Sequence, residues 1–541
     1  MKMKITNILL TAAALVLGLS ACDKFLDVNP DNRAQLDTPE KVVRILGSAY
    51  MKNGYPFICE MMSDNVDEYN DNNPYTGRFL EQVWYWKDVT ESNNESPERL
   101  WSSAYMAIAN ANAALDAIEK LGGAEASPTL AQAKGEALMS RAYHHFILVN
   151  VFAKHYNPAT AANDLGITYM VESEHTLNPQ YERNSVQEIY EFIDKDIQEA
   201  LPLMGDDNIT VPAYHFTRRA GYAFAAKFYL FYEKVDKAIE YANQCLGNAP
   251  ESLLRDYVEP ASNFEAVGRH YIAADQKCNL LLFTAHSQMG PTFGAYYTNS
   301  KYAHGSYLAT NETSNRSRYL WGSNGWISRV RRYSGTNLDK TLFFRIPYLF
   351  EYTDPVAGIG YSRAVYPALT TDETLLIRAE AKILQNDFQG ATDDLNIWLH
   401  NISSTSYVLT PDAIINYEKG LNYATWNAST PKKHLNPAFD IGAEGSDKEC
   451  MIQFLLDCRR IETLQLGLRW FDVKRYGIEI WRRQMNASGT PQTLKDVLKV
   501  DDERRAVQIP QKVVDAGYQA NPRDGDNDTS KYEGEPLSES E

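Results

Sequence analysis

The chain has 541 residues and a formal net charge of −17 at pH 7, because 70 acidic residues outnumber 53 basic ones. This charge argues against nucleic acid as a partner, since phosphate binding requires a basic surface. Six cysteines in a chain of this length, with no CxxC pair, do not make a disulfide framework. Aromatic residues make up 12% of the chain, which is enough for both a packed core and an aromatic-lined surface.

The first 22 residues have the features of a targeting segment. Lys2 and Lys4 precede an apolar stretch over 8–19 that is too short to span a bilayer comfortably. The sequence Leu19-Ser20-Ala21-Cys22 then resembles a bacterial lipobox, in which the cysteine thiol is acylated. We therefore predict a signal peptide over 1–21, a lipid anchor on Cys22 and a polar tether over 22–38, because acyl chains on one cysteine anchor a protein stably. The alternative is an ordinary signal peptide that happens to end in cysteine.

Apolar residues at helical spacing predict a mainly helical region over 39–250. Ser185 and Glu188 form a capping box, which marks the start of one helix. The segment 61–98 interrupts the pattern with many Asp, Asn and aromatic residues, and we expect it to be irregular and partly exposed. The predicted helices begin near residue 39 and then cover 99–121, 130–156, 185–201, 218–232 and 235–246.

Two helical hairpins, 217–250 and 370–399, have the same pattern of small and large apolar residues. Five pairs of positions agree in phase: Ala226 with Ala379, Val235 with Phe388, Ala238 with Ala391, Ala242 with Leu395, and Leu246 with Leu399. A helix pair of about 34 residues with alanine facing aromatic side chains is typical of the tetratricopeptide repeat. One pair cannot bury its own apolar face, so the pattern predicts stacked copies with one continuous core. The alternative is two unrelated amphipathic hairpins.

The segment 251–369 separates the two hairpins and is rich in Tyr, Gly, Ser and Asn. We predict a loop-rich insertion with minor strands near 280–284 and 341–347. An insertion of this length inside a helical repeat array is more often functional than accidental. We therefore expect the ligand-binding region to include it.

The region 370–522 holds the second hairpin, an irregular stretch over 402–448 and a helix over 449–483. The last segment, 523–541, is acidic and rich in Ser and Gly, and we expect it to be disordered at the end. The whole pattern predicts a mainly α fold, in which a superhelix of tetratricopeptide-like hairpins carries an irregular, loop-rich subdomain.

Two aromatic-rich regions are candidates for binding a sugar. Flat aromatic faces stack on the C–H faces of sugar rings, and neighbouring Asn, Asp and Arg side chains can bind the hydroxyl groups. The alternative for each ring is packing in the core or between loops. The first region contains Tyr75, Trp84, Tyr85 and Trp86, near Asn72, Asn73 and Arg78; the second contains Tyr296, Tyr297, Tyr302, Tyr307, Trp321 and Trp326, near Asn299, Asn324 and Arg329. From these we select Tyr75, Trp84, Trp86, Tyr296, Trp321 and Trp326 as the predicted ligand platform.

Short motifs from Cys22 to the C-terminal region form a recognisable set. They are the start Cys22-Asp23-Lys24-Phe25-Leu26-Asp27-Val28-Asn29-Pro30, the helix from Trp101 to Asn112, Glu136-Ala137 with Arg141-Ala142-Tyr143, Cys458-Arg459-Arg460-Ile461-Glu462 with the run from Leu468 to Gly477, and Ile509-Pro510-Gln511 with Asn521-Pro522. Together they resemble the SusD/RagB family of outer-membrane nutrient-binding lipoproteins of Bacteroidetes.

The resemblance implies both a fold and an activity. The implied fold has four tetratricopeptide-like helix pairs that scaffold a more irregular subdomain. The implied activity is non-catalytic binding of oligosaccharide, or in some members peptide, at the cell surface for a partner TonB-dependent (SusC-like) transporter of the outer membrane. Ligand sites are implied in regions comparable to the segment before the first long repeat helix and to the insertion, but no single residue is implied.

Sequence signatures of catalysis are missing. The chain has no G-x-S-x-G elbow, no H-E-x-x-H and no P-loop, so we predict no enzyme and no cofactor. We also predict no metal, because the calcium-loop spacing from Asp524 to Glu535 has Thr529 where glycine is required. Arg469-Trp470-Phe471-Asp472 is interpreted as structural, with Arg469 paired to carboxylates of neighbouring helices. A peptide-capturing protein of the same architecture and a protein-only scaffold stay open as alternatives.

Overall fold

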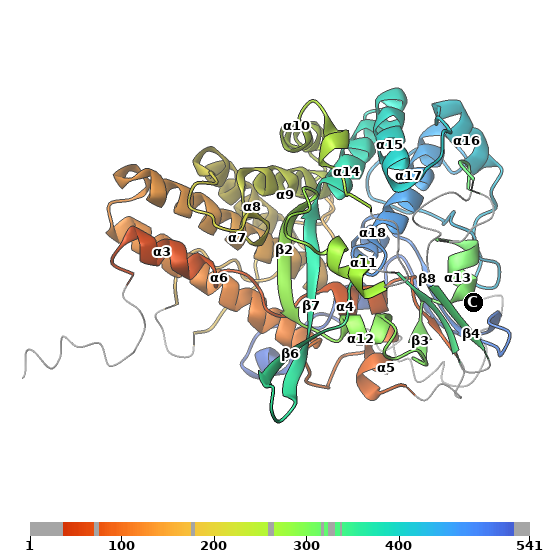
Figure 1. Cartoon of the computed structure of the whole chain (residues 1–541), viewed down its shortest axis with the longest axis horizontal. Coiled ribbons are helices and arrows are strands. Elements are labelled where there is room, and N and C mark those ends of the chain that lie inside the picture. Colours follow the sequence, from red (N-terminus) through yellow and green to blue (C-terminus); the bar gives the residue numbers. More distant parts are fainter. Residues whose placement is uncertain are drawn as a thin grey trace, which may run out of the picture.

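Stacked helices form one side of the molecule, and three small sheets with short helices form the other (Figure 1). The computed structural model describes residues 36–69, 75–174, 179–257, 264–314, 319–322, 331–335, 338–343 and 345–523. The predicted signal peptide, Cys22, Trp326 and the segment 524–541 lie outside the described residues. None of the described helices is both long and apolar enough to cross a bilayer.

The N-terminal helices begin where the sequence supplies capping side chains. They are α3 (Pro39–Leu46), α6 (Pro97–Lys120), α7 (Pro128–Phe152) and α8 (Val186–Ala200), and α7 packs against both α6 and α8. Three of them start with proline, whose missing N–H costs nothing in the first turn. The capping box of Ser185 and Glu188 at the start of α8 is confirmed.

The two predicted hairpins are present and stack on each other. The first is α9 (Arg218–Phe231) with α10 (Val235–Leu246), and the second is α14 (Thr371–Leu384) with α15 (Phe388–Ile402). Helix α10 packs directly against α14, although the whole insertion separates them in sequence. Ala226 and Ala379 are both fully buried, as are Ala242 and Leu395. The repeat and the mainly α, tetratricopeptide-like fold class are therefore confirmed.

The C-terminal region departs from the sequence prediction in two places. The stretch 402–448 contains a helix, α16 (Pro411–Lys419), and the predicted helix over 449–483 is two helices and a strand: α17 (Asp447–Thr463), α18 (Arg469–Arg475) and β8 (Ile480–Met485). The helix breaks between α17 and α18, where Gln465 and Gly467 have φ values of 63° and 71°, and it ends before β8 because Gly477 has a φ of 56° and a Cβ there would lie 2.5 Å from the carbonyl oxygen of Asn436. The chain therefore turns after α18 and returns as a strand.

The segment 61–98 is irregular and partly exposed over 85–96, as predicted, but it also contains regular and buried elements. It includes the end of α4 (Pro56–Met62), the short strand β1 (Asp67–Glu68) and α5 (Arg78–Trp84), and α4 and β1 are buried throughout. The strand β1 lies between β8 and β3 (Tyr302–Ala303) in a sheet of order β3-β1-β8-β9 that ends with β9 (Pro491–Leu498). Through this sheet the N-terminal segment, the insertion and the C-terminal region meet.

The insertion contains most of the remaining strands. A three-stranded antiparallel sheet has the order β2-β7-β6, with β2 (Asn279–His286), β7 (Ile359–Thr370) and β6 (Leu349–Asp354) at the edge. The predicted strand near 280–284 is thus confirmed, whereas 341–347 contains only the end of β5. The other elements are β4 (Arg331–Gly335), β5 (Leu338–Leu342), α11 (Phe264–Tyr271), α12 (Met289–Phe293), α13 (Ser306–Asn311), α19 (Gln511–Asp515) and the short 3₁₀ helices Ala124–Ala126, Leu201–Leu203, Pro212–Tyr214, Pro250–Leu253 and Glu503–Arg505.

Candidate functional site: an exposed group of tyrosines

Trp84 and Trp86 are buried, so neither presents a ring face to solvent. The indole N–H of Trp84 donates to the carbonyl oxygen of Val66 at 2.9 Å, and that of Trp86 donates to the carbonyl oxygen of Met62 at 2.8 Å. The guanidinium of Arg482 lies over both rings, 3.9 Å from the centroid of Trp86 and 4.8 Å from that of Trp84. The expectation of partial exposure is wrong for both residues, because their polar and charged partners come from α4, β8 and the turn before β1.

Trp321 is buried as well. Its ring stacks on Tyr319 at 4.8 Å between centroids and meets Trp398 and Phe454 edge-on. It therefore packs the insertion against α15 and α17. Trp326, the remaining tryptophan of the predicted platform, lies outside the described residues.

The two predicted tyrosines, in contrast, come together at the surface. Tyr75 stacks on Tyr297 with ring centroids 3.7 Å apart, and Tyr297 meets Tyr296 at 4.8 Å. Tyr296 in turn meets Tyr348 at 5.2 Å. Tyr296 is 62% exposed and Tyr348 is 38% exposed. We call these four residues, Tyr75, Tyr296, Tyr297 and Tyr348, the tyrosine platform.

Backbone pairing brings the two halves of the tyrosine platform together. The amide of Tyr75 donates to the carbonyl oxygen of Asn299 at 3.4 Å, and the amide of Lys301 donates to that of Tyr75 at 2.9 Å. This short parallel pairing places the segment before α5 beside the segment after α12. Two regions that are more than two hundred residues apart in the sequence thus supply one aromatic surface.

A buried lysine fixes the segment that carries Tyr296 and Tyr297. The ammonium group of Lys340 donates to the carbonyl oxygens of Thr292, Gly294 and Tyr297, the last two at 2.7 and 2.9 Å. Burial lowers the pKa of Lys340 to about 7. These three hydrogen bonds satisfy carbonyl groups at the end of α12 and in the following turn, so the tyrosine pair is held by the body of the protein.

The tyrosine platform has the chemistry of a sugar-binding surface rather than of a catalytic centre. Ring faces of tyrosine can stack on sugar C–H faces while the hydroxyl groups bind sugar hydroxyls. Thr298 and Asn299 add half-exposed polar side chains beside Tyr297. Burial raises the pKa of Tyr75, so its hydroxyl stays neutral at physiological pH. Tyr348 was missed by the sequence analysis, although it starts an alternating Tyr348-x-Phe350-x-Tyr352 pattern typical of a strand.

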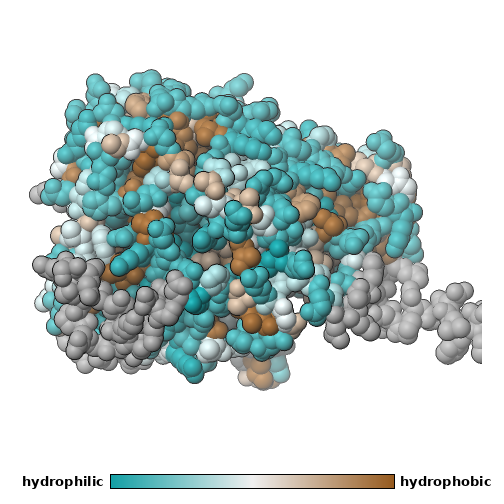
Figure 2. Space-filling view, turned by 180° about the vertical axis from the view of Figure 1, so that it is seen from behind, coloured by the Kyte–Doolittle hydropathy of each residue, from teal (hydrophilic) through white to brown (hydrophobic). Residues whose placement is uncertain are grey.

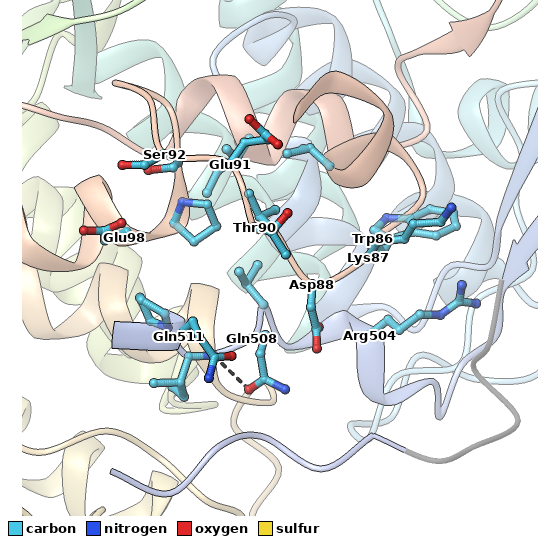
Figure 3. Close-up of a pocket in the computed structure, with 18 of the residues that line it drawn as sticks. Trp86, Lys87, Asp88, Thr90, Glu91, Ser92, Glu98, Arg504, Gln508 and Gln511 are labelled. Carbon is cyan, nitrogen blue, oxygen red and sulfur yellow. Dashed lines mark hydrogen bonds between the residues drawn. The ribbon is translucent and has the colours of Figure 1, made fainter. Parts of the chain in front are cut away.

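A cavity of about 260 Å³ is a second candidate site (Figure 3). Gln508 and Gln511 lie across it from Glu91 and Ser92, and its apolar lining includes Trp86, Ile58 and Val507. The charged groups around it pair with each other: Lys512 contacts Glu98 at 2.6 Å, Arg523 contacts Asp88 at 3.1 Å, and Arg504 contacts Asp496 at 2.6 Å. With these charges already neutralised, the cavity offers a ligand apolar contact and neutral polar side chains such as Thr90, Ser92 and Gln508.

Metal and disulfide chemistry receive no support from the described parts of the chain. No group of three or more His, Cys, Asp or Glu side chains among those residues has the geometry to hold a metal ion. The described cysteines, Cys59, Cys245, Cys278, Cys450 and Cys458, are buried, and none of them forms a disulfide. The calcium-loop spacing that starts at Asp524 lies outside the described residues.

The family comparison and the structural comparison agree with each other. Residues 24–230 match a family model for SusD-like proteins, described as starch-binding and associating with the outer membrane. No curated protein matches the chain. A SusD superfamily protein of Bacteroides thetaiotaomicron is 16% identical with a TM-score of 0.58, and the match covers 91% of this chain and 100% of that one.

Two structures from Bacteroides vulgatus are similar to the same degree. One is a SusD superfamily protein, 16% identical with a TM-score of 0.60, and the match covers 91% of this chain and 99% of that one. The other is a SusD-like carbohydrate binding protein, 16% identical with a TM-score of 0.55, and the match covers 84% of this chain and 85% of that one. At these identities the likeness establishes the shared fold.

Proposed function

We propose that this chain, whose residues 24–230 match the SusD-like family model, binds oligosaccharide at the cell surface through the tyrosine platform. The observation that carries the proposal is the exposed ring of Tyr296, which is braced by Tyr297 and Tyr348 and therefore does not need to be ordered when a ligand arrives. A ring that is ordered beforehand loses less conformational entropy on binding. The starch-binding description of the family model and the carbohydrate-binding description of one structural neighbour support this ligand class.

The proposal includes the place and the partner of the protein. Acylation of Cys22 would hold the acidic body at the outer membrane, and the bound sugar would pass to a TonB-dependent transporter without being cleaved. The SusD-like kinship supports both points, as does the lipobox-like sequence before Cys22. Peptide capture and a protein-only scaffold are the competing functions, and the experiment below separates them.

The test uses soluble protein that starts after Cys22. Gel retardation is measured against starch, other polysaccharides and host glycans, with binding to a peptide digest followed by Trp fluorescence. Retardation by one glycan class, made at least about tenfold weaker by Tyr296→Ala, is the expected result, because one lost stacking contact of about 1.4 kcal/mol changes affinity tenfold. Tyr181→Ala, at an exposed tyrosine of the loop before α8, is the matched control and should leave binding unchanged.

The other outcomes would overturn the proposal in distinct ways. Retardation that does not respond to Tyr296→Ala would move the site away from the tyrosine platform, and the cavity beside Trp86 would be the next place to test. A response to peptides alone would establish the peptide-capturing function. Binding to neither class would leave the scaffold function.

A further inference from the structure

The hairpin of β6 and β7 projects from the body of the molecule and exposes apolar side chains. In Figure 1 it is the lowest element below the central strands, and Figure 2 shows hydrophobic residues on the matching projection. Phe350 is 37% exposed and Tyr352 is 57% exposed, and Val356 in the turn is almost completely exposed. Large apolar side chains grouped on one projection are unusual on a protein that binds nothing there.

The exposed rings of the hairpin continue the tyrosine platform. Tyr348 directly precedes β6, Leu349 is buried, and Phe350 is exposed again, so Tyr348 and Phe350 lie on the opposite side of the chain from Leu349. The rings of Phe350 and Tyr352 meet at 4.9 Å between centroids. Alternate residues of a strand are about 6.6 Å apart, so the row from Tyr348 to Tyr352 is roughly 13 Å long. We call Tyr348, Phe350 and Tyr352 the aromatic row.

The register of the sheet shows where the hairpin leaves the three-stranded sheet. Phe350 is paired with Ser362 and Tyr352 with Gly360, whereas the last residue of β2, His286, is paired with Arg363. The hairpin therefore runs past the end of β2. Beyond β2 the two strands form a two-stranded ribbon, on which residues 350–354 are all exposed.

The ring of Phe350 lies against a glycine of the opposite strand. A Cβ at Gly360 would be 2.0 Å from the carbonyl oxygen of Glu351 and 2.7 Å from the Cε1 atom of Phe350, so these two groups leave no room for a larger residue. The ring of Phe350 is thus held against the opposite strand. A ring that is supported in this way loses less conformational entropy when it stacks on a ligand.

On these observations we propose that the binding site extends from the tyrosine platform along the aromatic row and takes a linear oligosaccharide chain of several sugar units. This inference rests on the proposed function and specifies its ligand class. A linear chain fits because the rings follow one line, and each sugar unit presents its own C–H face for stacking. A mono- or disaccharide is too short to use the whole line, so affinity should increase with chain length.

The test compares short and long oligomers, beginning with the starch pair maltose and maltoheptaose and continuing with the oligomers of any other glycan that retards the protein. The double variant Phe350→Ala/Tyr352→Ala should bind the long oligomer about tenfold more weakly or worse, and the short one as the wild type does. Tyr296→Ala should weaken both. Tyr352→Phe keeps the ring face and should keep most of the wild-type affinity for the long oligomer. Val356→Ser, in the turn beyond the row, is the control and should change neither affinity.

Each other result overturns the inference. Unchanged long-chain binding in the double variant, with Tyr296→Ala still effective, would confine the site to the tyrosine platform and leave the proposed function intact. Equal losses for short and long oligomers would mean that the hairpin only supports the tyrosine platform. If the double variant or Val356→Ser instead changed self-association or binding of a transporter, the hairpin would be a protein contact. Binding of no glycan at all would overturn the proposed function together with this inference.

Discussion

At the scale of single residues, the buried Lys340 holds the segment that carries Tyr296 and Tyr297. Its side chain is buried and ends among three backbone carbonyl groups, without a carboxylate among these hydrogen-bond partners. Because burial brings its pKa to about 7, the group changes at neutral pH between an ammonium with three N–H donors and an amine with two. Only the charged form therefore has one N–H donor for each of the three carbonyl acceptors.

Replacing Lys340 with methionine is expected to loosen the segment that carries Tyr296 and Tyr297. Methionine fills similar space but donates no hydrogen bond, and each buried carbonyl left without a donor costs about 1–3 kcal/mol. Hydrogen exchange should therefore become faster over 292–297, and glycan affinity should fall. Lys195→Met, at an exposed lysine of α8, serves as the control. Unchanged exchange over 292–297 would show that Lys340 does not position the tyrosines.

Exposure at single positions also shows why the predicted platform contains exposed Tyr296 together with the buried Trp84 and Trp86. Aromatic residues beside Asn and Gly are typical of both binding loops and buried turns, so local sequence does not separate the two cases. What buries Trp84 and Trp86 is Arg482, which follows them by almost four hundred residues and hydrogen-bonds to the carbonyl oxygens of Trp84, Ser63 and Met62. A partner at that separation leaves no local signal.

At the scale of elements, the two hairpins that flank the insertion stack on each other. Leu395 of α15 is the counterpart of Ala242 of α10, and both are fully buried. Leu395→Ala should lower the free energy of unfolding by about 2–5 kcal/mol, because the cavity adds to the lost burial. Urea denaturation measures this change. Met106→Ala, at an exposed position of α6, should change it by less than about 0.5 kcal/mol. An equally small effect of Leu395→Ala would contradict the repeat interface.

Elements with a helical period could be predicted more fully than elements defined by strand pairing, of which β2 was predicted and β8 was not. The helices of the two hairpins have apolar residues at a period of 3.6. This period can be recognised within the sequence of each helix alone. Apolar residues continue from α18 into strand β8. The sequence analysis therefore predicted that the helix continued into β8. The partner strands β1 and β9 and the turn at Gly477 define β8, and of the two partner strands only β9 lies near it in the sequence.

At the scale of the whole molecule, a buried group of charges joins distant parts of the chain. Asp64 follows α4 and contacts Arg469 at 2.8 Å, as the structural interpretation of Arg469 predicts, while Glu312 after α13 contacts Arg460 at 2.6 Å and Lys433 at 2.8 Å. Burial alone would raise the pKa of both carboxyl groups, but the surrounding cations outweigh it and hold both pKa values far below their usual range. Ion pairs thus link the N-terminal segment and the insertion to helices α17 and α18.

This charge group should make the folded chain sensitive to acid, and Glu312 offers the sharpest test. Its folded pKa lies below the unfolded value of about 4.5, so its stabilising contribution is complete above that pH and is lost as the pH falls below it, when the unfolded state takes up the proton first. Glu312→Gln leaves buried cations without their partner and should cost about 3–5 kcal/mol at pH 7. In urea denaturation from pH 7 to pH 3, the difference from the wild type should shrink below about pH 4.5. Glu240→Gln, at an exposed position of α10, should show no such convergence, and a constant difference for Glu312→Gln would mean that its charge does not carry the stability.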